Sequence, residues 1–175
     1  MDFIMDDMIL KTERLLLRYQ RKTDVSFLVD LWTDEDMTQY TGGPRNKNEL
    51  IEEFERIASE PQKEEYDLWP IELKKSHELI GYAGLTPKEI KGTDYIELNY
   101  FIAKNYWRNG YAKEIAMALI KYGFEEKGLI KLIAIINPEN EPSKIVAEKV
   151  GMKYWINEVR SGKEKSIYII ENEEI

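Results

Sequence analysis

The sequence of 175 residues contains no cysteine and only one histidine. Without cysteine the chain can form no disulfide bond, hold no zinc ion through thiolates and use no cysteine nucleophile. One histidine cannot build a histidine-rich metal site and argues against histidine-based hydrolysis, so we expect no bound metal. That residue, His77, lies in the charged turn KKSHE, far along the chain from every motif discussed below. We expect it to be an incidental surface residue.

Long apolar runs and an excess of positive charge are also missing. No segment approaches the roughly 20 apolar residues that span a bilayer. The N-terminal stretch MDFIMDDMIL carries acids where a secretory signal has a basic start. The net charge of -8 argues against broad nucleic-acid binding. We therefore expect a cytoplasmic protein that binds neither membranes nor nucleic acids.

The chain does contain enough apolar residues for a core. They make up 43% of the sequence, which is far above the fraction found in disordered chains. The length suits one domain, and no repeat, linker or low-complexity tract divides it.

The acidic residues are unevenly distributed. Residues 24–67 contain 13 Asp and Glu against 4 Lys and Arg, so this segment carries -9 and the rest of the chain +1. Two interpretations remain open. The segment forms a solvated helix surface, or it forms the mouth of a site that attracts a cationic substrate.

Hydrophobic periodicity predicts a mixed α/β domain. A run of antiparallel strands leads into one strand–helix–strand unit, which favours a mixed sheet covered by helices. Pro87 is expected to end the third strand. The predicted strands cover residues 14–19, 67–73, 79–85, 95–102, 131–136, 154–159 and 165–170, and the predicted helices cover 24–32, 46–59, 110–127 and 141–150.

A glycine stands where the most regular helix begins. Gly110 follows a predicted strand and precedes a helix whose apolar residues recur every three or four positions. The first turn of a helix has N–H groups without partners and the positive end of the helix dipole, so it binds anions. Arg108 and Lys113 add positive charge beside it. Alternatively, Gly110 serves only the turn between strand and helix. Neither a P-loop nor a Rossmann glycine motif is present.

Four stretches carry a resemblance to a known family. They are TERLLLR from Thr12, ELIGYAGL from Glu78, YWRNGYAKE from Tyr106 and INPENEPSKIVAEKVGM from Ile136. In this order they resemble the GNAT superfamily of acyl-CoA-dependent N-acyltransferases, and most of all its ribosomal-protein N-terminal acetyltransferase branch. The resemblance covers about residues 10–170. It implies a mostly antiparallel seven-stranded sheet with about four flanking helices, in a domain spanning 10–175 after an N-terminal extension at 1–9.

The resemblance also implies where acetyl-CoA binds. The family's phosphate loop reads [QR]-x-x-G-x-[GA], and Trp107 departs from it at the first position. The strand before the loop would pair its backbone with the pantetheine arm, and Asn140 matches an Asn that touches that arm. The residues implied for CoA binding are Tyr100, Phe101, Ile102, Trp107, Arg108, Asn109, Gly110, Tyr111, Ala112, Lys113, Asn140 and Ser143.

The attack of an amine on a thioester needs a group that removes the amine proton. Glu97 is the candidate base, since it lies in the apolar strand YIELNYFI and the family branch usually has Glu there. An apolar setting should raise the pKa of its carboxyl. The alternative is a Glu on the solvent face of an alternating strand.

The leaving thiolate needs a proton, and its donor is a separate question. Many members of the superfamily carry a Tyr where this chain has Ala147. Ser143 is the candidate donor, because it matches a Ser of the ribosomal-protein branch. It could instead satisfy backbone groups at a helix start, and water could protonate the thiolate.

Two aromatic residues are candidates for the acceptor pocket. Tyr40 precedes the loop TGGP, and Trp69 lies in the second predicted strand. Ordinary packing is the alternative for both.

The sequence thus predicts an N-acetyltransferase that uses acetyl-CoA and no metal. Direct transfer within a ternary complex is expected, since no cysteine can carry the acetyl group. A protein N-terminus, a polyamine and an aminoglycoside amine remain open as acceptors, and a monomer and a homodimer as assembly states. The alternative function is a non-catalytic CoA-binding or regulatory module on the same fold.

Overall fold

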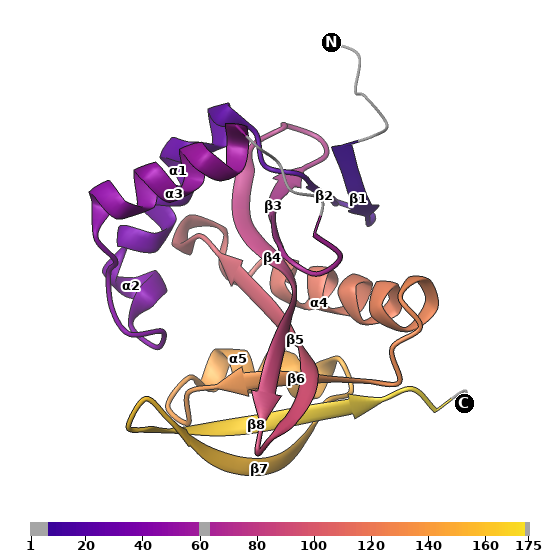
Figure 1. Ribbon diagram of the computed structural model, residues 1–175. Coiled ribbons are helices and arrows are strands. Elements are labelled where there is room, and N and C mark those ends of the chain that lie inside the picture. Colours follow the sequence, from indigo (N-terminus) through magenta and orange to yellow (C-terminus); the bar gives the residue numbers. More distant parts are fainter. Residues whose placement is uncertain (1–6, 60–63, 174–175) are drawn as a thin grey trace.

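The computed structural model describes residues 7–59 and 64–173, which build one mixed sheet flanked by helices (Figure 1). The strands run in the order β1-β2-β3-β4-β5-β6-β8-β7. They are β1 Met8–Lys11, β2 Leu15–Arg18, β3 Leu68–Leu73, β4 Leu79–Ile90, β5 Thr93–Ile102, β6 Lys131–Ile136, β7 Lys153–Arg160 and β8 Lys163–Glu171. The helices are α1 Val25–Thr33, α2 Glu35–Thr38, α3 Lys47–Ser59, α4 Tyr111–Lys121 and α5 Glu141–Lys149.

One pair of neighbouring strands differs from all the others in this sheet. β5 and β6 run parallel, and their register joins only Glu97 to Ile133. Every other neighbouring pair is antiparallel, and β4 pairs with β5 along ten residues. Parallel neighbours need a long crossover, which α4 provides here. Past Glu97, β5 therefore has a hydrogen-bonded partner only on its β4 side.

The helices cover both faces of the sheet. On one face, α4 packs Ile115 and Leu119 into the main core, which α5 completes with Ala147. On the other face, Leu28 of α1 and Phe54 of α3 form a second cluster. In Figure 1 these two helices lie beside the upper part of β4, and α4 lies across β5. The sheet half that contains β2 to β5 is thus held from both sides.

The observed elements match most of the predicted ones. The mixed, mostly antiparallel sheet is confirmed, with eight strands where seven were expected and five helices where about four were expected. The additional elements are the short β1 and α2. The expected boundary at residue 10 falls inside β1, which pairs with β2. The helix predicted to reach Lys127 ends at Lys121 and continues as a π turn over Tyr122–Glu126.

Pro87 does not end its strand, contrary to the prediction. β4 continues through it to Ile90, and Pro87 lies opposite Ile96 of β5. The Leu85 N–H donates to Asp67 on the β3 side, at 3.1 Å. Two residues later, the missing N–H of Pro87 lies on that same side, and the register of β3 ends opposite Gly84. Proline is tolerated at such an edge because no ladder hydrogen bond is lost.

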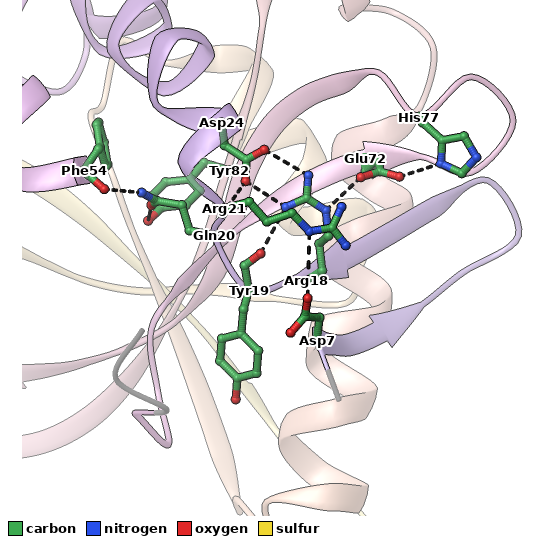
Figure 2. A network of polar contacts seen from close by, with 10 residues as sticks. All are labelled: Asp7, Arg18, Tyr19, Gln20, Arg21, Asp24, Phe54, Glu72, His77 and Tyr82. Carbon is green, nitrogen blue, oxygen red and sulfur yellow. Dashed lines mark hydrogen bonds and ion pairs between the residues drawn. The ribbon is translucent and has the colours of Figure 1, made fainter. Parts of the chain in front are cut away.

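A buried ion network holds the N-terminal half together (Figure 2). The Arg18 guanidinium donates to Glu72 of β3 at 2.8 Å and to Asp24 before α1 at 2.7 Å. All three side chains are 3–4% exposed. Gln20 extends the network by donating to the Phe54 carbonyl of α3 at 2.8 Å. The network therefore fixes two helices against the sheet.

His77 belongs to this network and is not incidental. Its Nδ1 lies 2.7 Å from Oε1 of Glu72, although the imidazole is 55% exposed. Burial alone would raise the pKa of Glu72, but hydrogen bonds from Arg18 and His77 outweigh it and lower that pKa. The sequence alone does not reveal the contact between His77 and Glu72, because the contact depends on the conformation of the turn between β3 and β4.

Replacing Arg18 with Met should strongly destabilise the protein. Two buried carboxylates would lose their partner, which costs about 3–5 kcal/mol in comparable cases. Glu72 stabilises the wild type above the ordinary carboxyl pKa, and this contribution is lost as pH falls through its lowered pKa. The difference in the free energy of unfolding between R18M and the wild type should therefore become smaller below about pH 4. Urea unfolding at several pH values measures this difference.

Arg21→Met is the matched control. Arg21 is 39% exposed and pairs with Asp7 only at 3.9 Å, so its loss should cost less than about 1 kcal/mol. Equal destabilisation by R18M and R21M would contradict a structural role for the buried network.

Candidate active site

The loop before α4 presents a row of backbone N–H groups. Arg108 and Gly110 both have a left-handed backbone, with φ of 62° and 79°. The first bond within the helix runs from the Glu114 N–H to the Gly110 carbonyl at 3.1 Å. The N–H groups of residues 111–113 precede that bond, and no side chain caps the helix. Such an arrangement of backbone N–H groups binds anions.

Arg108 has a backbone conformation that is unusual for its place in the fold. A left-handed backbone is strained for residues other than glycine. The other described residues of this kind, His77, Lys91 and Ser161, lie in tight turns between paired strands. Arg108 lies in a loop between a strand and a helix, where strain of this sort is common at binding sites.

Arg14 holds the loop from the turn between β1 and β2. Its Nε donates to Glu114 at 2.6 Å and its Nη1 to the Asn109 carbonyl at 2.9 Å. The guanidinium carbon lies 4.5 Å from the centre of the Tyr111 ring, within the range of a cation–π contact. The Thr12 hydroxyl adds a 2.6 Å bond to Glu114. The sequence analysis missed both Arg14 and Glu114. The TERLLLR stretch, which contains Arg14, was the available signal, but it was interpreted only as a strand and as part of the family resemblance.

Trp107 and Asn109 fix the shape of the loop. The Trp107 indole N–H donates to the Ile102 carbonyl at 2.6 Å. The Asn109 amide donates to the Tyr106 and Trp107 carbonyls, both at 3.0 Å. Trp107 thus ties the loop to the end of β5, although it departs from the residue types expected there.

The free edge of β5 leads directly to this loop. The Ala103 N–H donates to Ile80 of β4 at 2.8 Å. Successive residues of a strand point to alternate sides, so the N–H of Phe101 also faces β4. The N–H groups of Tyr100 and Ile102 face the opposite side, where β6 has separated. This edge can accept an extended ligand as a further strand would.

A pocket of about 170 Å³ opens where β5 and β6 diverge. It brings together five predicted residues of the reaction and CoA sites, and also Tyr40. The residues of the phosphate loop do not line it. The lining comprises Tyr40, Thr41, Glu97, Leu98, Asn99, Tyr100, Phe101, Ala134, Ile135, Ile136, Asn137, Asn140, Ser143 and Lys165.

Glu97 is buried in the wall of this pocket, with 7% of its surface exposed. Burial raises the pKa of its carboxyl, and this effect exceeds the opposing effect of Lys88 and of the Ile135 N–H. The Lys88 ammonium lies 3.9 Å from Oε2. The solvent-facing alternative considered for Glu97 does not match this position.

Asn140 and Ser143 form the opposite wall, at the start of α5. The Asn140 side chain accepts from the Ser143 N–H at 3.2 Å and so caps the helix. The Tyr100 hydroxyl donates to the Ser143 carbonyl at 3.0 Å, and burial raises the pKa of Tyr100. The hydrogen bond between Tyr100 and Ser143 thus links β5 to the start of α5 across the opening.

The two aromatic candidates for the acceptor pocket lie in different places. Tyr40 lines the pocket, and its carbonyl accepts from Lys165 at 3.4 Å. Trp69 is 3% exposed and packs in the main core. Trp69 therefore has the packing role considered as its alternative, because its position in β3 points its indole into the core.

Known proteins are similar to this chain in sequence and in fold. The family model described as acetyltransferase (GNAT) domain matches residues 14–153. The uncharacterized protein YkkB of Bacillus subtilis (strain 168) is 35% identical over 146 residues, covering 83% of this chain and 85% of that protein. The uncharacterized N-acetyltransferase YoaA of the same strain is 29% identical over 150 residues, covering 83% and 82%. The crystal structure of the acetyltransferase (GNAT family) from Bacillus anthracis is similar with a TM-score of 0.78 at 26% identity, covering 93% and 97%.

Within 7–59 and 64–173, no helix is both long and apolar enough to cross a membrane. In the same residues, His, Asp and Glu nowhere form a group of three that could hold a metal ion.

Replacing Glu97 with Gln should stabilise the protein at neutral pH. A carboxyl with a raised pKa costs stability as pH rises from its unfolded to its folded pKa, because the folded state holds the proton more tightly. Gln mimics the protonated form, so the gain should be near zero at about pH 4 and grow above it. Melting temperatures from pH 4 to 8 measure the trend.

Asp94→Asn is the matched control, since Asp94 lies exposed on the same strand. It should shift the melting temperature little at any pH. If E97Q also shows no pH-dependent gain, the buried setting inferred for Glu97 is wrong.

Proposed function

This chain belongs to the acetyltransferase (GNAT) domain family, and we propose that it transfers an acetyl group from acetyl-CoA to a primary amine. The transfer is direct, within a ternary complex, because the chain has no cysteine to carry the acetyl group. One observation carries the proposal. An N–H-lined loop at the start of α4 continues into a free strand edge, and that edge ends at a pocket holding a buried carboxylate.

The residues present fit acetyl-CoA. The N–H groups of residues 111–113 would hold the diphosphate, with positive charge from Arg14, Arg108 and Lys113 beside them. The amide groups of pantetheine match the N–H and carbonyl groups of Tyr100 and the N–H of Ile102 on the free edge of β5. Asn140 retains its amide N–H groups for this arm, since only its oxygen caps α5.

Glu97 removes the proton from the amine. An amine with a pKa of about 8–10 is mostly protonated at pH 7 and cannot attack until it loses a proton. A carboxylate with a raised pKa is the stronger base, and Glu97 has such a pKa because it is buried. Acetyl-CoA supplies an activated acyl group whose thiolate leaves readily.

The reaction forms the C–N bond and breaks the C–S bond, and the ammonium loses two protons as it becomes an amide. Glu97 takes the first proton before the attack and later releases it to solvent. The second proton leaves the nitrogen after the attack and replaces the one that the donor gives to the thiolate. Ser143 can donate the thiolate's proton, since no hydrogen bond of its hydroxyl to the described residues is recorded. Water is the alternative donor.

Replacing Gly110 with Val should weaken CoA binding. Gly110 has φ of 79°, which strains a β-branched residue. This strain disturbs the N–H row, so the dissociation constant for CoA should rise about tenfold or more. Isothermal titration with CoA measures it.

Gly92→Val is the matched control for Gly110→Val. Gly92 has the same φ of 79° but lies at the tip of the β4–β5 hairpin with nothing close to it. Its replacement should cost similar stability and leave CoA affinity unchanged. Unchanged affinity in G110V would mean that the phosphates bind elsewhere.

Glu97→Gln should lower kcat by a factor of about 10² or more, since general base catalysis contributes that much. The acidic limb of the pH–rate profile, which reports the ionisation of the base, should also disappear. CoA affinity should stay within about twofold. Rates of CoA release with a panel of amines measure kcat and its pH profile, and isothermal titration measures the affinity for CoA.

The alternative, a non-catalytic CoA-binding module, makes a different prediction for the same assay. If CoA binds tightly but no amine is acetylated by the wild type, the module is the correct function.

A further inference from the structure

The charges inside the pocket differ from those of the whole protein. Among its lining residues, the only carboxylate is Glu97 and the only ammonium is Lys165. None of the described acids of the segment 24–67 lines the pocket, although that segment carries most of the negative charge. The net charge of -8 therefore says little about the acceptor.

Several acids of that segment have structural partners instead. Asp24 binds Arg18, Asp36 binds Lys104, and Glu53 binds Arg45. Asp34 caps α2 by accepting from the Met37 N–H at 2.8 Å. Of the two interpretations left open for residues 24–67, these contacts favour a helix surface over the mouth of a site for a cationic substrate.

Lys165 is half-buried on β8, where its ammonium has no carboxylate partner among the described residues. The ammonium donates a long hydrogen bond, of 3.4 Å, to the Tyr40 carbonyl. Glu158 lies opposite it on β7. The Glu158 carboxylate instead accepts from Arg160 at 2.6 Å and from the Lys91 N–H at 3.1 Å. An ammonium that lines a small pocket and forms no ion pair with the described carboxylates attracts an anionic group from a ligand.

The surroundings of Glu97 are cationic as well. Lys88 lies 3.9 Å from its carboxylate, and Arg160 acts on it electrostatically. A polyamine or an aminoglycoside would bring several positive charges next to these side chains. Like charges placed together cost affinity, so these cations disfavour such acceptors.

We propose that the acceptor is a small amine that also bears a carboxylate, as an α-amino acid does. Its amine faces Glu97 and its carboxylate pairs with Lys165, so the pocket binds both ends of the molecule. The inference rests on the function proposed above and narrows its substrate class. Lys165 is then a specificity-determining residue, and the acetyl transfer itself follows the bond changes already described.

The test compares amino acids with the amines that lack only their carboxylate. L-alanine, L-methionine and L-phenylalanine are each paired with the corresponding decarboxylated amine, and spermidine is added as a polycation. In the wild type, at least one amino acid should exceed its paired amine in kcat/KM by about tenfold or more, because a charge-assisted hydrogen bond is lost without the carboxylate. Lys165→Met should remove this preference mainly through KM, and Lys165→Arg should keep it.

Lys163→Met is the matched control, since Lys163 is exposed two residues earlier on β8. It should leave the preference unchanged. A purely structural role of Lys165 would make K165M affect amino acids and paired amines equally, and that result would overturn the inference.

A second readout does not depend on turnover. With CoA present, the preferred amino acid should raise the melting temperature of the wild type more than that of K165M, since ligands of the folded state stabilise it. Acetylation of paired amines or spermidine in preference to every amino acid would overturn the inference but leave the acetyltransferase function intact. CoA binding without acetylation of any amine would instead overturn the acetyltransferase function, and the melting shift would then decide the role of Lys165.

Discussion

The candidate site depends on two neighbouring strands that pair at one point and then separate. β5 and β6 are joined at Glu97 and Ile133, and past that point each strand exposes an edge to the opening. Unpaired backbone groups inside a sheet are normally costly. Where the two strands diverge, α4 packs against β5 and α5 packs against β6, and both helices contribute to the same core. Each strand is therefore supported by its own helix at the opening.

Buried charge is used differently in the two halves of the sheet. Arg18 lies between Asp24 and Glu72, and hydrogen bonds satisfy all three groups, so that network adds rigidity. Glu97 is buried without so close a partner, since its nearest cation lies 3.9 Å away. A carboxylate held in this state is unfavourable for stability but useful for removing protons. The rigid half next to it limits how far the strands can relax around that charge.

Local patterns account for what the sequence could predict. The strands and long helices follow from periodicity. Gly110 was found because it stands between a predicted strand and the most regular predicted helix, whose unpartnered N–H groups can bind an anion. The contacts that shape the site could not be found in this way. Arg14 meets Glu114 across 100 residues, and Lys165 meets Tyr40 across 125. Pro87 was misjudged for the same reason, because its effect depends on where β3 ends.

Arg14 bonds to the first turn of α4 and to the loop before it. Through these bonds, ligand binding at the loop and the stability of the N-terminal strands are thermodynamically coupled, so that each favours the other. Whatever stabilises the loop around Gly110 also stabilises the turn between β1 and β2, because the same guanidinium bonds to Asn109 and Glu114. A ligand in the loop would thus slow hydrogen exchange at Leu15 to Leu17, which lie remote from the loop in the chain. Hydrogen exchange in β2, next to the edge of the sheet, would thus report ligand binding at the central opening.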